Sequence, residues 1–481
     1  MAKEPKLENG LLKPPKEPER MTPYCWWVLF IGTASWLFDC MDQRIFVLSR
    51  SWALRDLLPP GTSDLDINSY GDYVTAAMIT GWAVGGLFFG IVGDKWGRVR
   101  TLSTSIFVYS MFTGLSGLSQ TWYDFCLWRF LMGCGIGGAF ATAATLIAET
   151  MPSRYRPWAL GVFQALSATG NMIGSLVATY VIKPGLPFLG TEIPGWRVIF
   201  FFGIAPALLI VLIMRTIKEP ERWQQAQKTA KSALDRQLGD LKSMMRHRRW
   251  RRNVIVGVLL SVSGVVGLWG IGFWSPELIS EALQDASDAE KNYVRGIGTF
   301  VQEIGSFCGM FFFTLMAVWL GRRFTFGLCF ILGYLVVAFV FIRLNSASQA
   351  YWMLPMVGFA TLSVFGGYAI YFPEIFPTRL RATGTGICYN VGRIIAAVIM
   401  LFKIPMKNFF TDNLGLVRET DPQVIAEASQ SFFGLVKISP FRAVALAMCT
   451  IYVVGLVALI WAPETKGKPL PTDDDLESTQ S

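Results

Sequence analysis

The chain has 481 residues, of which 52% are hydrophobic, 14% aromatic and only 16% charged, and its mean hydropathy is +0.42. Soluble domains carry about 25% charged residues, so this composition predicts a polytopic membrane protein whose backbone polar groups are satisfied within helices. The formal net charge of +9 lies mainly in short loops between apolar runs. Membrane topology explains that placement better than nucleic-acid binding, which we do not expect.

Sulfur and imidazole side chains indicate no metal or redox chemistry. The eight cysteines lie in or beside apolar runs, and none has a CxxC or metal-ligand spacing. We therefore expect no disulfide framework, no bound metal and no cofactor. The single histidine, His247, lies in a basic segment. A proton path within the membrane would therefore depend on carboxylates.

Long apolar runs and short polar loops alternate along the chain. Residues 1–21 are polar and proline-rich and lack the apolar core of a secretory signal, so we expect a cytoplasmic tail there. The apolar runs that follow are each about 20 residues or longer, enough to cross a bilayer. They lie near residues 25–50, 70–94, 100–120, 125–150, 157–182 and 196–217, and then near 253–282, 292–319, 323–343, 350–375, 381–405 and 439–462.

This order predicts an all-α membrane protein of about twelve transmembrane helices in two six-helix bundles, residues 22–217 and 253–462. The basic stretch 218–252 between them is typical of an amphipathic segment on the cytoplasmic surface, close to anionic lipid head groups. Residues 463–481 form a second cytoplasmic tail. The loop before the last run is longer than two packed helices need, and its residues 421–437 are long enough for a short surface helix.

Loop charges predict the orientation in the membrane. Basic residues follow the even-numbered runs, as Lys95 and Arg98 follow the second and Arg154 the fourth, whereas alternate loops are acidic or mixed, as at Asp64 and Asp66. Because basic loops stay in the cytoplasm, both termini are expected there. We therefore expect a multi-pass protein of the cell (inner) membrane.

A glycine-rich segment follows the second run. Residues 90–100 read GIVGDKWGRVR, in which glycines permit a tight turn and Asp94 is placed to cap a helix or pair with an arginine. After the eighth run, residues 320–323 read LGRR, but Val318 takes the place of the aspartate. Such a loop is able to latch two helices in one state of a moving protein. We expect the stronger latch in the first half.

Two further pairs of motifs occupy corresponding positions of the two halves. Residues 148–156 (AETMPSRYR) correspond to 373–381 (PEIFPTRLR), and 218–223 (KEPERW) correspond to 463–467 (PETKG). Together with the glycine-rich loop they form an internal repeat, and in this set of motifs the chain resembles the major facilitator superfamily. The resemblance implies a major facilitator fold. It also implies a cytoplasmic gate of ion pairs among Asp94, Arg98, Glu149, Arg154, Glu374 and Arg379.

Three stretches narrow the resemblance. Residues 36–46, 267–276 and 386–397 are similar to the proton-coupled organic-anion branches of the superfamily, the sialate, lactate and aromatic-acid symporters. The chain departs from those branches at Cys40-Met41 and at Gln43-Arg44. The identity of the substrate therefore does not carry over from the resemblance.

Charged residues inside membrane spans are costly and mark functional sites. Asp39 and Asp42 are three residues apart and share one helix face. Two carboxylates so close in a low dielectric resist ionising together, so one is expected to hold a proton near neutral pH. We predict a role in proton coupling for Asp39, Asp42 and Glu303. The alternative is that Asp39 only satisfies polar groups between helices.

Arg393 is expected deep in the eleventh helix, where its planar guanidinium would suit a bidentate grip on a carboxylate. The alternative is a structural salt bridge to Glu303. The chain also offers neutral polar groups for a small apolar cavity, with Trp36, Trp269 and Tyr371 as further aromatic candidates. The predicted substrate-binding residues are Arg44, Gln164, Asn171, Trp274, Gln302, Tyr389, Asn390 and Arg393.

These patterns favour a monomeric secondary active transporter that imports a small organic anion, a monocarboxylate or sugar acid, by proton symport with alternating access. Sodium stays open as the coupling ion, and membrane lipid and the substrate are the expected partners. A sugar or polyol carrier is the first alternative, but the seventh helix lacks paired glutamines and Arg393 favours an anion. An organic-cation carrier and a transport-inactive sensor are further alternatives. No catalytic motif is present, so we expect no enzyme activity.

Overall fold

The computed structural model describes residues 7–8, 11–12, 20–181, 186–188, 191–232, 237–269, 274–401, 403–414 and 439–471. The helix predicted at 421–437 lies outside these residues, as does most of the N-terminal tail. The described strands are two or three residues long and pair in two antiparallel hairpins. They are β1 (Leu7–Glu8) with β2 (Leu11–Leu12), and β3 (Leu186–Phe188) with β4 (Thr191–Ile193).

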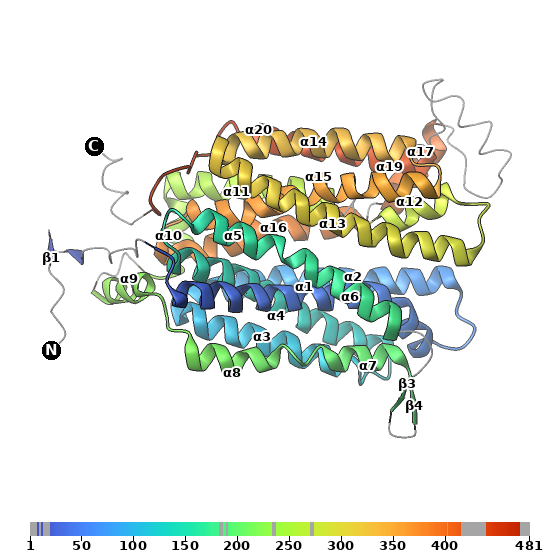
Figure 1. Cartoon of the computed structure of the whole chain (residues 1–481), viewed down its shortest axis with the longest axis horizontal. Helices are drawn as coiled ribbons and strands as arrows, with labels where there is room; N and C mark the ends of the chain where they lie inside the picture. The colour runs from blue at the N-terminus through green and yellow to red at the C-terminus, as the bar shows by residue number, and fades with distance from the viewer. Residues whose placement is uncertain are drawn as a thin grey trace.

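Helices that lie roughly parallel form two groups side by side, with both ends of the chain at the same end of the molecule (Figure 1). We call this the termini end. The first group comprises α1 (Pro23–Leu57), α2 (Asp64–Trp96), α3 (Arg98–Ser116), α4 (Trp122–Thr150), α5 (Arg156–Ala165), α6 (Ser167–Val181), α7 (Gly195–Phe202) and α8 (Ala207–Thr216).

Two short helices at the termini end, α9 (Glu221–Ser232) and α10 (Leu241–Arg246), connect the groups. The second group comprises α11 (Arg248–Trp269), α12 (Ser275–Ala282), α13 (Asp288–Leu320), α14 (Arg322–Arg343), α15 (Ala347–Glu374), the 3-10 helix η3 (Thr378–Leu380), α16 (Arg381–Leu401), α17 (Lys403–Leu414), α19 (Pro440–Cys449) and α20 (Ile451–Ala458).

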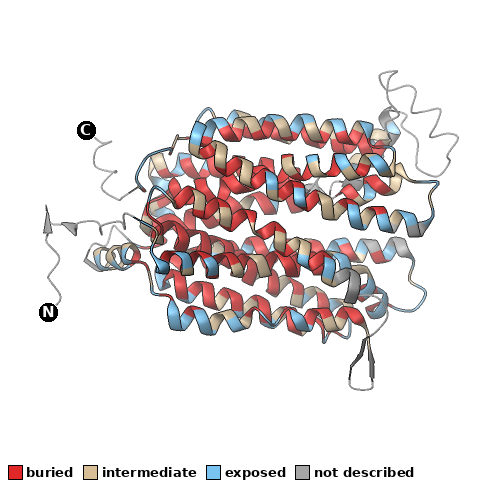
Figure 2. Ribbon diagram, in the orientation of Figure 1, coloured by how far each residue is buried: buried red, intermediate tan, exposed pale blue. Residues whose placement is uncertain are grey.

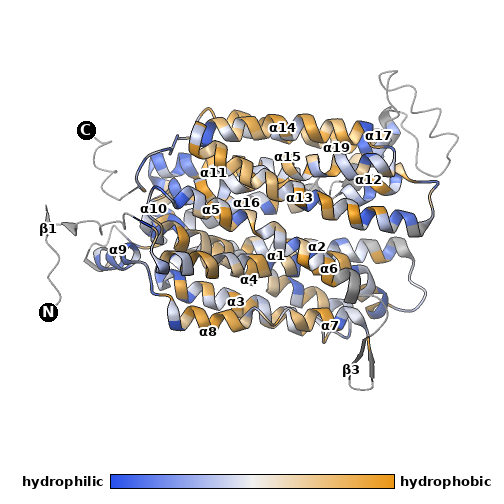
Figure 3. Cartoon of the chain, viewed as in Figure 1, coloured by the Kyte–Doolittle hydropathy of each residue, from blue (hydrophilic) through white to orange (hydrophobic). Residues whose placement is uncertain are grey.

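Within the described residues, nine stretches are long and apolar enough to cross a bilayer, and three of these join two consecutive short helices. Helices α1, α3 and α16 run alongside them (Figure 1) and carry charged or hydroxyl side chains that lower their hydropathy. Together they make the predicted twelve spans. Figure 3 shows the matching pattern, with apolar residues over the middle of the bundle and hydrophilic residues gathered at its ends.

Helices α4 and α15 form the centres of their groups. In each, 83% of the most apolar window is buried, against 28% in the stretch of α7 and α8 (Figure 2). Local sequence fixes where α4 begins, because Thr121 and Asp124 form a capping box in which each side chain accepts a hydrogen bond from the other residue's backbone N–H. Glu149 and Glu374 lie at the ends of these two central helices.

Helices α2 and α4 approach closely because glycines lie at their contact. A β-carbon at Gly81 or Gly85 would lie 2.0 Å from a backbone carbonyl oxygen of α4, and one at Gly137 would lie 2.1 Å from the oxygen of Trp82. In lipid, where no hydrophobic driving force joins helices, such small-residue contacts provide the close packing that holds them together.

We expect Gly85→Val to lower the melting temperature of the purified protein, because overpacking of this kind costs roughly 1–3 kcal/mol or more. Gly296→Ala is the control, since a β-carbon there meets no atom within 4 Å and alanine favours the helix over glycine. Thermal unfolding in one detergent compares them. Equal melting temperatures for Gly85→Val and the wild type would contradict the close α2–α4 contact.

Candidate functional site: a latch at the termini end and a cavity between the halves

Tight turns at the termini end join α2 to α3 and α13 to α14. Gly97 and Gly321 have φ values of 118° and 94° there, a region that side chains with a β-carbon rarely adopt. Glu219 accepts the backbone N–H groups of α3 at 2.7–3.3 Å, and Glu464 accepts those of α14 at 3.0 Å. These carboxylates satisfy helix starts that lack a side-chain cap of their own.

Burial opposes the ionisation of Glu464, but hydrogen bonds from four backbone N–H groups outweigh it and lower the pKa of this carboxyl below its usual value. Glu219 and Glu464 belong to the repeated motifs at 218–223 and 463–467. The sequence singled out these motifs without assigning a role to the glutamates. Their shared role in capping accounts for their equivalent positions in the two halves.

Buried ion pairs connect the turn after α2 to the end of α4. Arg98 donates to both carboxylate oxygens of Glu149 at 3.1 and 3.0 Å and pairs with Asp94 at 3.1 Å. All three side chains are fully buried. A buried guanidinium that two carboxylates share is well compensated, whereas removal of one partner would leave an uncompensated buried charge.

The same residues contact the second half of the chain. Asp94 accepts the backbone N–H groups of Ala382 and Thr383 at 3.2 and 2.8 Å, and Glu149 accepts from Arg381 at 2.8 Å. These bonds join the halves at the termini end. They constitute what we call the latch: Asp94, Arg98, Glu149, Arg381 and Thr383.

Three other residues predicted for this gate lie outside the latch. Arg154 is exposed beside Tyr155. Arg379 donates to the hydroxyl of Ser243 in α10 at 3.2 Å. Glu374 pairs with Arg322 at 2.8 Å, which parallels the pair of Glu149 with Arg98. Asp94, in the first copy of the glycine-rich loop, accepts hydrogen bonds from α16. The equivalent position of the second copy is Val318, which carries no polar group and makes no such bonds.

Sequence reasoning missed Arg381, which lies two positions after Arg379 in the repeated motif. Its Nε donates to the carbonyl of Pro373 at 3.0 Å, and Arg156 makes the equivalent bond to Ala148 at 2.8 Å. The signal was present, because arginines recur at both positions of each motif copy. Both arginines of the second copy are buried, but only Arg381 donates to Glu149 of the first half.

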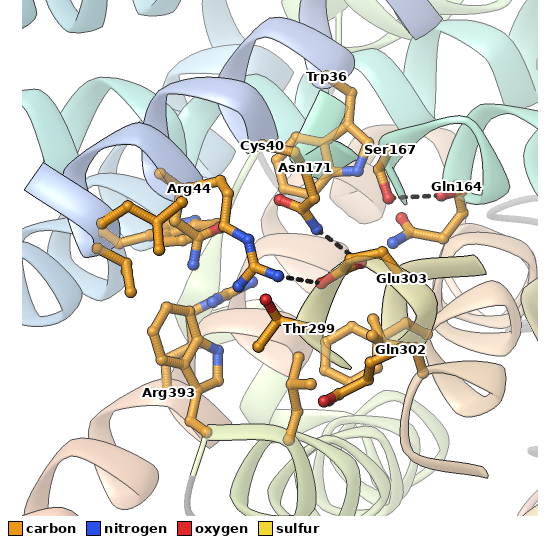
Figure 4. A pocket seen from close by; sticks show the side chains of 18 of the residues that line it. Trp36, Cys40, Arg44, Gln164, Ser167, Asn171, Thr299, Gln302, Glu303 and Arg393 are labelled. Carbon is orange, nitrogen blue, oxygen red and sulfur yellow. Dashed lines mark hydrogen bonds and ion pairs between the residues drawn. The ribbon is translucent and has the colours of Figure 1, made fainter. Parts of the chain in front are cut away.

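A cavity of about 950 Å³, its opening included, lies between the halves (Figure 4). Helices α1, α2, α5 and α6 contribute to its wall from the first half, and α11, α12, α13, α15 and α16 from the second. Of the predicted substrate-binding residues, six line the cavity: Arg44, Gln164, Asn171, Gln302, Tyr389 and Arg393.

An ion pair crosses this cavity. Arg44 of α1 donates to Glu303 of α13 at 3.3 Å, and Asn171 of α6 donates to the other oxygen of the same carboxylate at 3.2 Å (Figure 4). Arg44 also donates to Ser175 at 3.0 Å. Glu303 thus pairs with Arg44 of the opposite half. The alternative considered from the sequence, a salt bridge between Glu303 and Arg393, is not formed.

Arg393 lies between aromatic rings with much of its hydrogen-bonding capacity unused. Its guanidinium carbon is 3.6 Å from the ring centre of Trp82 and 4.5 Å from that of Tyr389. The side chain is 1% exposed, and among the described residues its Nε and Nη1 have no hydrogen-bond partner. Cation–π contact offsets part of this cost, but two buried donors remain available to an acceptor.

Asp39 and Asp42 are buried on α1 behind the cavity wall. Asp42 pairs with Arg129 of α4 at 3.2 Å, and Arg129 lies among phenylalanine rings, the nearest being Phe200 with its centre at 4.1 Å. Both oxygens of Asp39 lack a partner at hydrogen-bond distance among the described residues, although the Tyr109 hydroxyl of α3 interacts with its carboxyl. The two carboxyls thus have different environments despite their shared face.

The remaining predicted residues lie apart from the cavity. Trp274 packs against Phe441 with ring centres 5.7 Å apart, and Asn390 donates to its own helix at Gly386 and contacts Gly86 of α2. Neither lines the cavity. Trp82 and Arg129 were not predicted as site residues. Only the packing of α1 on α4 pairs Arg129 with Asp42.

Twelve spans in two related halves, with a cavity between them and a latch at one end, define a membrane transporter. A family model described as the Major Facilitator Superfamily matches residues 38–400. The chain belongs to this superfamily and is a multi-pass membrane transporter, not an enzyme.

Two curated relatives and one solved structure to which the chain is similar are also named as transporters. The chain is 32% identical to a cis,cis-muconate transport protein of Acinetobacter baylyi over 66% of this chain and 74% of that protein. It is 27% identical to a probable 4-methylmuconolactone transporter of Cupriavidus pinatubonensis over 87% of this chain and 91% of that protein. The proton:xylose symporter XylE has the same fold, with a TM-score of 0.68 at 18% identity over 95% of this chain and 99% of that chain.

Proposed function

We propose that this protein imports a small organic anion, a monocarboxylate or sugar acid, by proton symport. The observation that carries the proposal is Arg393, whose Nε and Nη1 lie buried in the wall of the cavity with no hydrogen-bond partner in the part of the chain that the structure describes. A carboxylate presents two oxygens to such a pair of donors. The name of the Acinetobacter relative refers to cis,cis-muconate, a dicarboxylate, which supports an organic anion as the substrate without favouring a single carboxylate.

The cavity wall supports an unsaturated or aromatic acid over a purely aliphatic one. Trp36, Trp82, Trp269 and Phe365 line it, and such rings offer faces on which a planar substrate stacks. Neutral polar side chains, among them Gln164, Asn171 and Gln302, also line the cavity and offer partners for the hydroxyls of a sugar acid. The likeness to a xylose symporter, at 18% identity, supports the fold and not a sugar substrate.

Asp39 is the carboxyl that we propose carries the proton. Glu303 has Arg44 as its partner and Asp42 has Arg129, whereas Asp39 faces Tyr109 of α3 and, on its own helix, Cys40 and Asp42. None of these groups is cationic: the Tyr109 hydroxyl stabilises the negative charge only by a hydrogen bond, and a buried carboxylate without a cationic partner is strongly disfavoured. When Asp39 releases its proton, its carboxylate would become negatively charged and would compete with that of Asp42 for Arg129.

Alternating access would follow from rocking of the two bundles, residues 22–217 and 253–462, about the cavity. In the structure the latch joins them at the termini end, which we propose faces the cytoplasm because the basic loops gather there. The state described is then the one closed toward the cytoplasm, and uptake requires the latch to open.

The test is uptake by proteoliposomes of benzoate, lactate and gluconate under an imposed pH gradient. We expect at least one acid to accumulate up to about tenfold when the outside is one pH unit more acidic, and a protonophore to abolish this. Asp39→Asn mimics the protonated form and should exchange the same acid across the membrane without responding to the gradient. Exposed Asp285→Asn is the control. Gradient-independent uptake in the wild type, or gradient-driven accumulation by Asp39→Asn, contradicts the proton role.

A further inference from the structure

A line of hydroxyl groups runs along α3, the third membrane span. Its members are four residues apart, so their side chains lie on one face of the helix. All are fully buried, and none of their hydroxyl oxygens has a hydrogen-bond partner among the described residues. We call them the hydroxyl stripe: Thr101, Ser105 and Tyr109. The same spacing continues to Thr113, which interacts with the carboxyl of Asp42.

The stripe extends from the proposed proton carrier to the latch. At one end, the hydroxyl of Tyr109 interacts with the carboxyl of Asp39 on α1. At the other end, Thr101 lies three residues after Arg98 of the latch, and its methyl group faces Gly93 of α2. Beyond its first three residues α3 carries no charged side chain. Hydroxyls are therefore the groups that this helix offers to a proton.

The spacing of the stripe suits a relay through water. Four helical residues rise about 6 Å, which is close to two hydrogen bonds of about 2.8 Å joined by one water. Buried hydroxyls without a protein partner are usually completed by ordered water. A hydroxyl both donates and accepts. Its oxygen can therefore take a proton from one water while its own proton passes to the next, and the side chain is left unchanged.

The second half of the chain carries no such stripe on the equivalent helix. Helix α14 starts after Gly321 as α3 starts after Gly97. Its residues that correspond to the stripe are Thr325, Cys329 and Gly333. Of these only Thr325 has a hydroxyl, and it donates to the carbonyl of Gly321 in its own helix at 2.7 Å. Because α14 fills the same place in the fold, packing of a bundle does not require the hydroxyls. They occur in the half that contains Asp39.

We infer that the hydroxyl stripe is the path by which Asp39 releases its proton toward the termini end, apart from the cavity that holds the substrate. This inference rests on the proposed role of Asp39 as proton carrier. The cavity is a poor route for this release, because Arg44 and Arg393 line it against one glutamate, and cations repel a proton. While the latch is closed, the fixed guanidinium of Arg98 is an electrostatic barrier at the end of the stripe. Opening of the latch removes that barrier.

Variants of single residues separate the hydroxyls from their packing. Thr101→Val keeps the shape of the side chain and removes the hydroxyl, whereas Thr101→Ser keeps the hydroxyl and removes the methyl group. Ser105→Ala interrupts the stripe at its middle. Ser103→Ala is the matched control, because Ser103 is a buried serine of α3 whose hydroxyl also has no partner among the described residues. It lies on a different face of the helix.

The experiment uses the proteoliposomes of the uptake assay, with the outside more acidic and with the acid that the wild type accumulates, whether benzoate, lactate or gluconate. It measures the initial rate of uptake, the final accumulation, and the exchange of labelled acid at equal pH on both sides. In Thr101→Val and Ser105→Ala we expect the initial rate to fall by about tenfold, because proton release becomes limiting. The final accumulation and the exchange should match the wild type. Thr101→Ser and Ser103→Ala should match it in all three measurements.

Several results would overturn the path while leaving the symport intact. One is wild-type initial rates in both Thr101→Val and Ser105→Ala. Another is equal slowing by Thr101→Val and Thr101→Ser, or by Ser103→Ala, which would show a packing role, as would slowing of exchange together with uptake. A wild type that accumulates none of the three acids is a different result. The proposed symport itself then fails, and the path fails with it.

Discussion

Replacement of Arg393 by methionine is expected to abolish anion binding while the melting temperature stays the same or rises. Hydrogen bonds to charged groups contribute about 1.5–3 kcal/mol, and each 1.4 kcal/mol is tenfold in affinity. Loss of two such donors therefore weakens binding by roughly 100-fold or more. The replacement should leave the stability unchanged or raise it, because Arg393 is 1% exposed and two of its donors have no partner among the described residues. Such a buried side chain destabilises the protein without substrate.

The combination of effects is what identifies Arg393 as a binding residue. A structural arginine would lower the melting temperature when replaced, as buried charges with partners do. Methionine retains apolar contact with the Trp82 ring. Benzoate binding and thermal unfolding are measured on the same preparation, with exposed Arg343→Met as the control. A methionine variant that melts well below the wild type, or that still binds benzoate as the wild type does, would remove Arg393 from the proposed site.

Replacement of Glu149 by glutamine is expected to shift the protein away from the state closed at the termini end. Glu149 accepts from Arg98 of its own half and from Arg381 of the other, and all three side chains are fully buried. Removal of one partner from a buried ion pair costs roughly 3–5 kcal/mol. Under the proposed alternating access only the latched state contains the bond to Arg381, so the balance between latched and open states should shift by about 100-fold or more.

Distance measurements between labels would detect this shift. Lys95 and Lys468 are exposed at the termini end of the first and second halves, so spin labels at these positions report opening in a background without native cysteines. We expect a longer mean distance in Glu149→Gln than in the parent. Glu221→Gln, an exposed carboxyl on α9, serves as the control. An unchanged distance distribution in Glu149→Gln would show that the latch does not hold the halves together.

The family and the architecture could be predicted from the sequence. Apolar runs of the length of a bilayer set the spans, since lipid leaves the backbone no other way to satisfy its polar groups. The internal repeat set the two-fold relation of the halves. The same physics selected the candidate residues, because a charge that persists inside a membrane span needs a function or a partner. Arg44, Glu303 and Arg393 were all found in this way, and all three line the cavity.

Only the tertiary structure decided which charge meets which. Arg44 and Glu303 are 259 positions apart in the chain, and Arg381 and Glu149 are 232 apart. Such pairs depend on how each helix is rotated and on which helices of the two halves adjoin. From the sequence, Arg393 was therefore a possible partner of Glu303, and Arg379 was predicted to belong to the gate. A residue type establishes that a charge must be compensated, whereas helix packing establishes what compensates it.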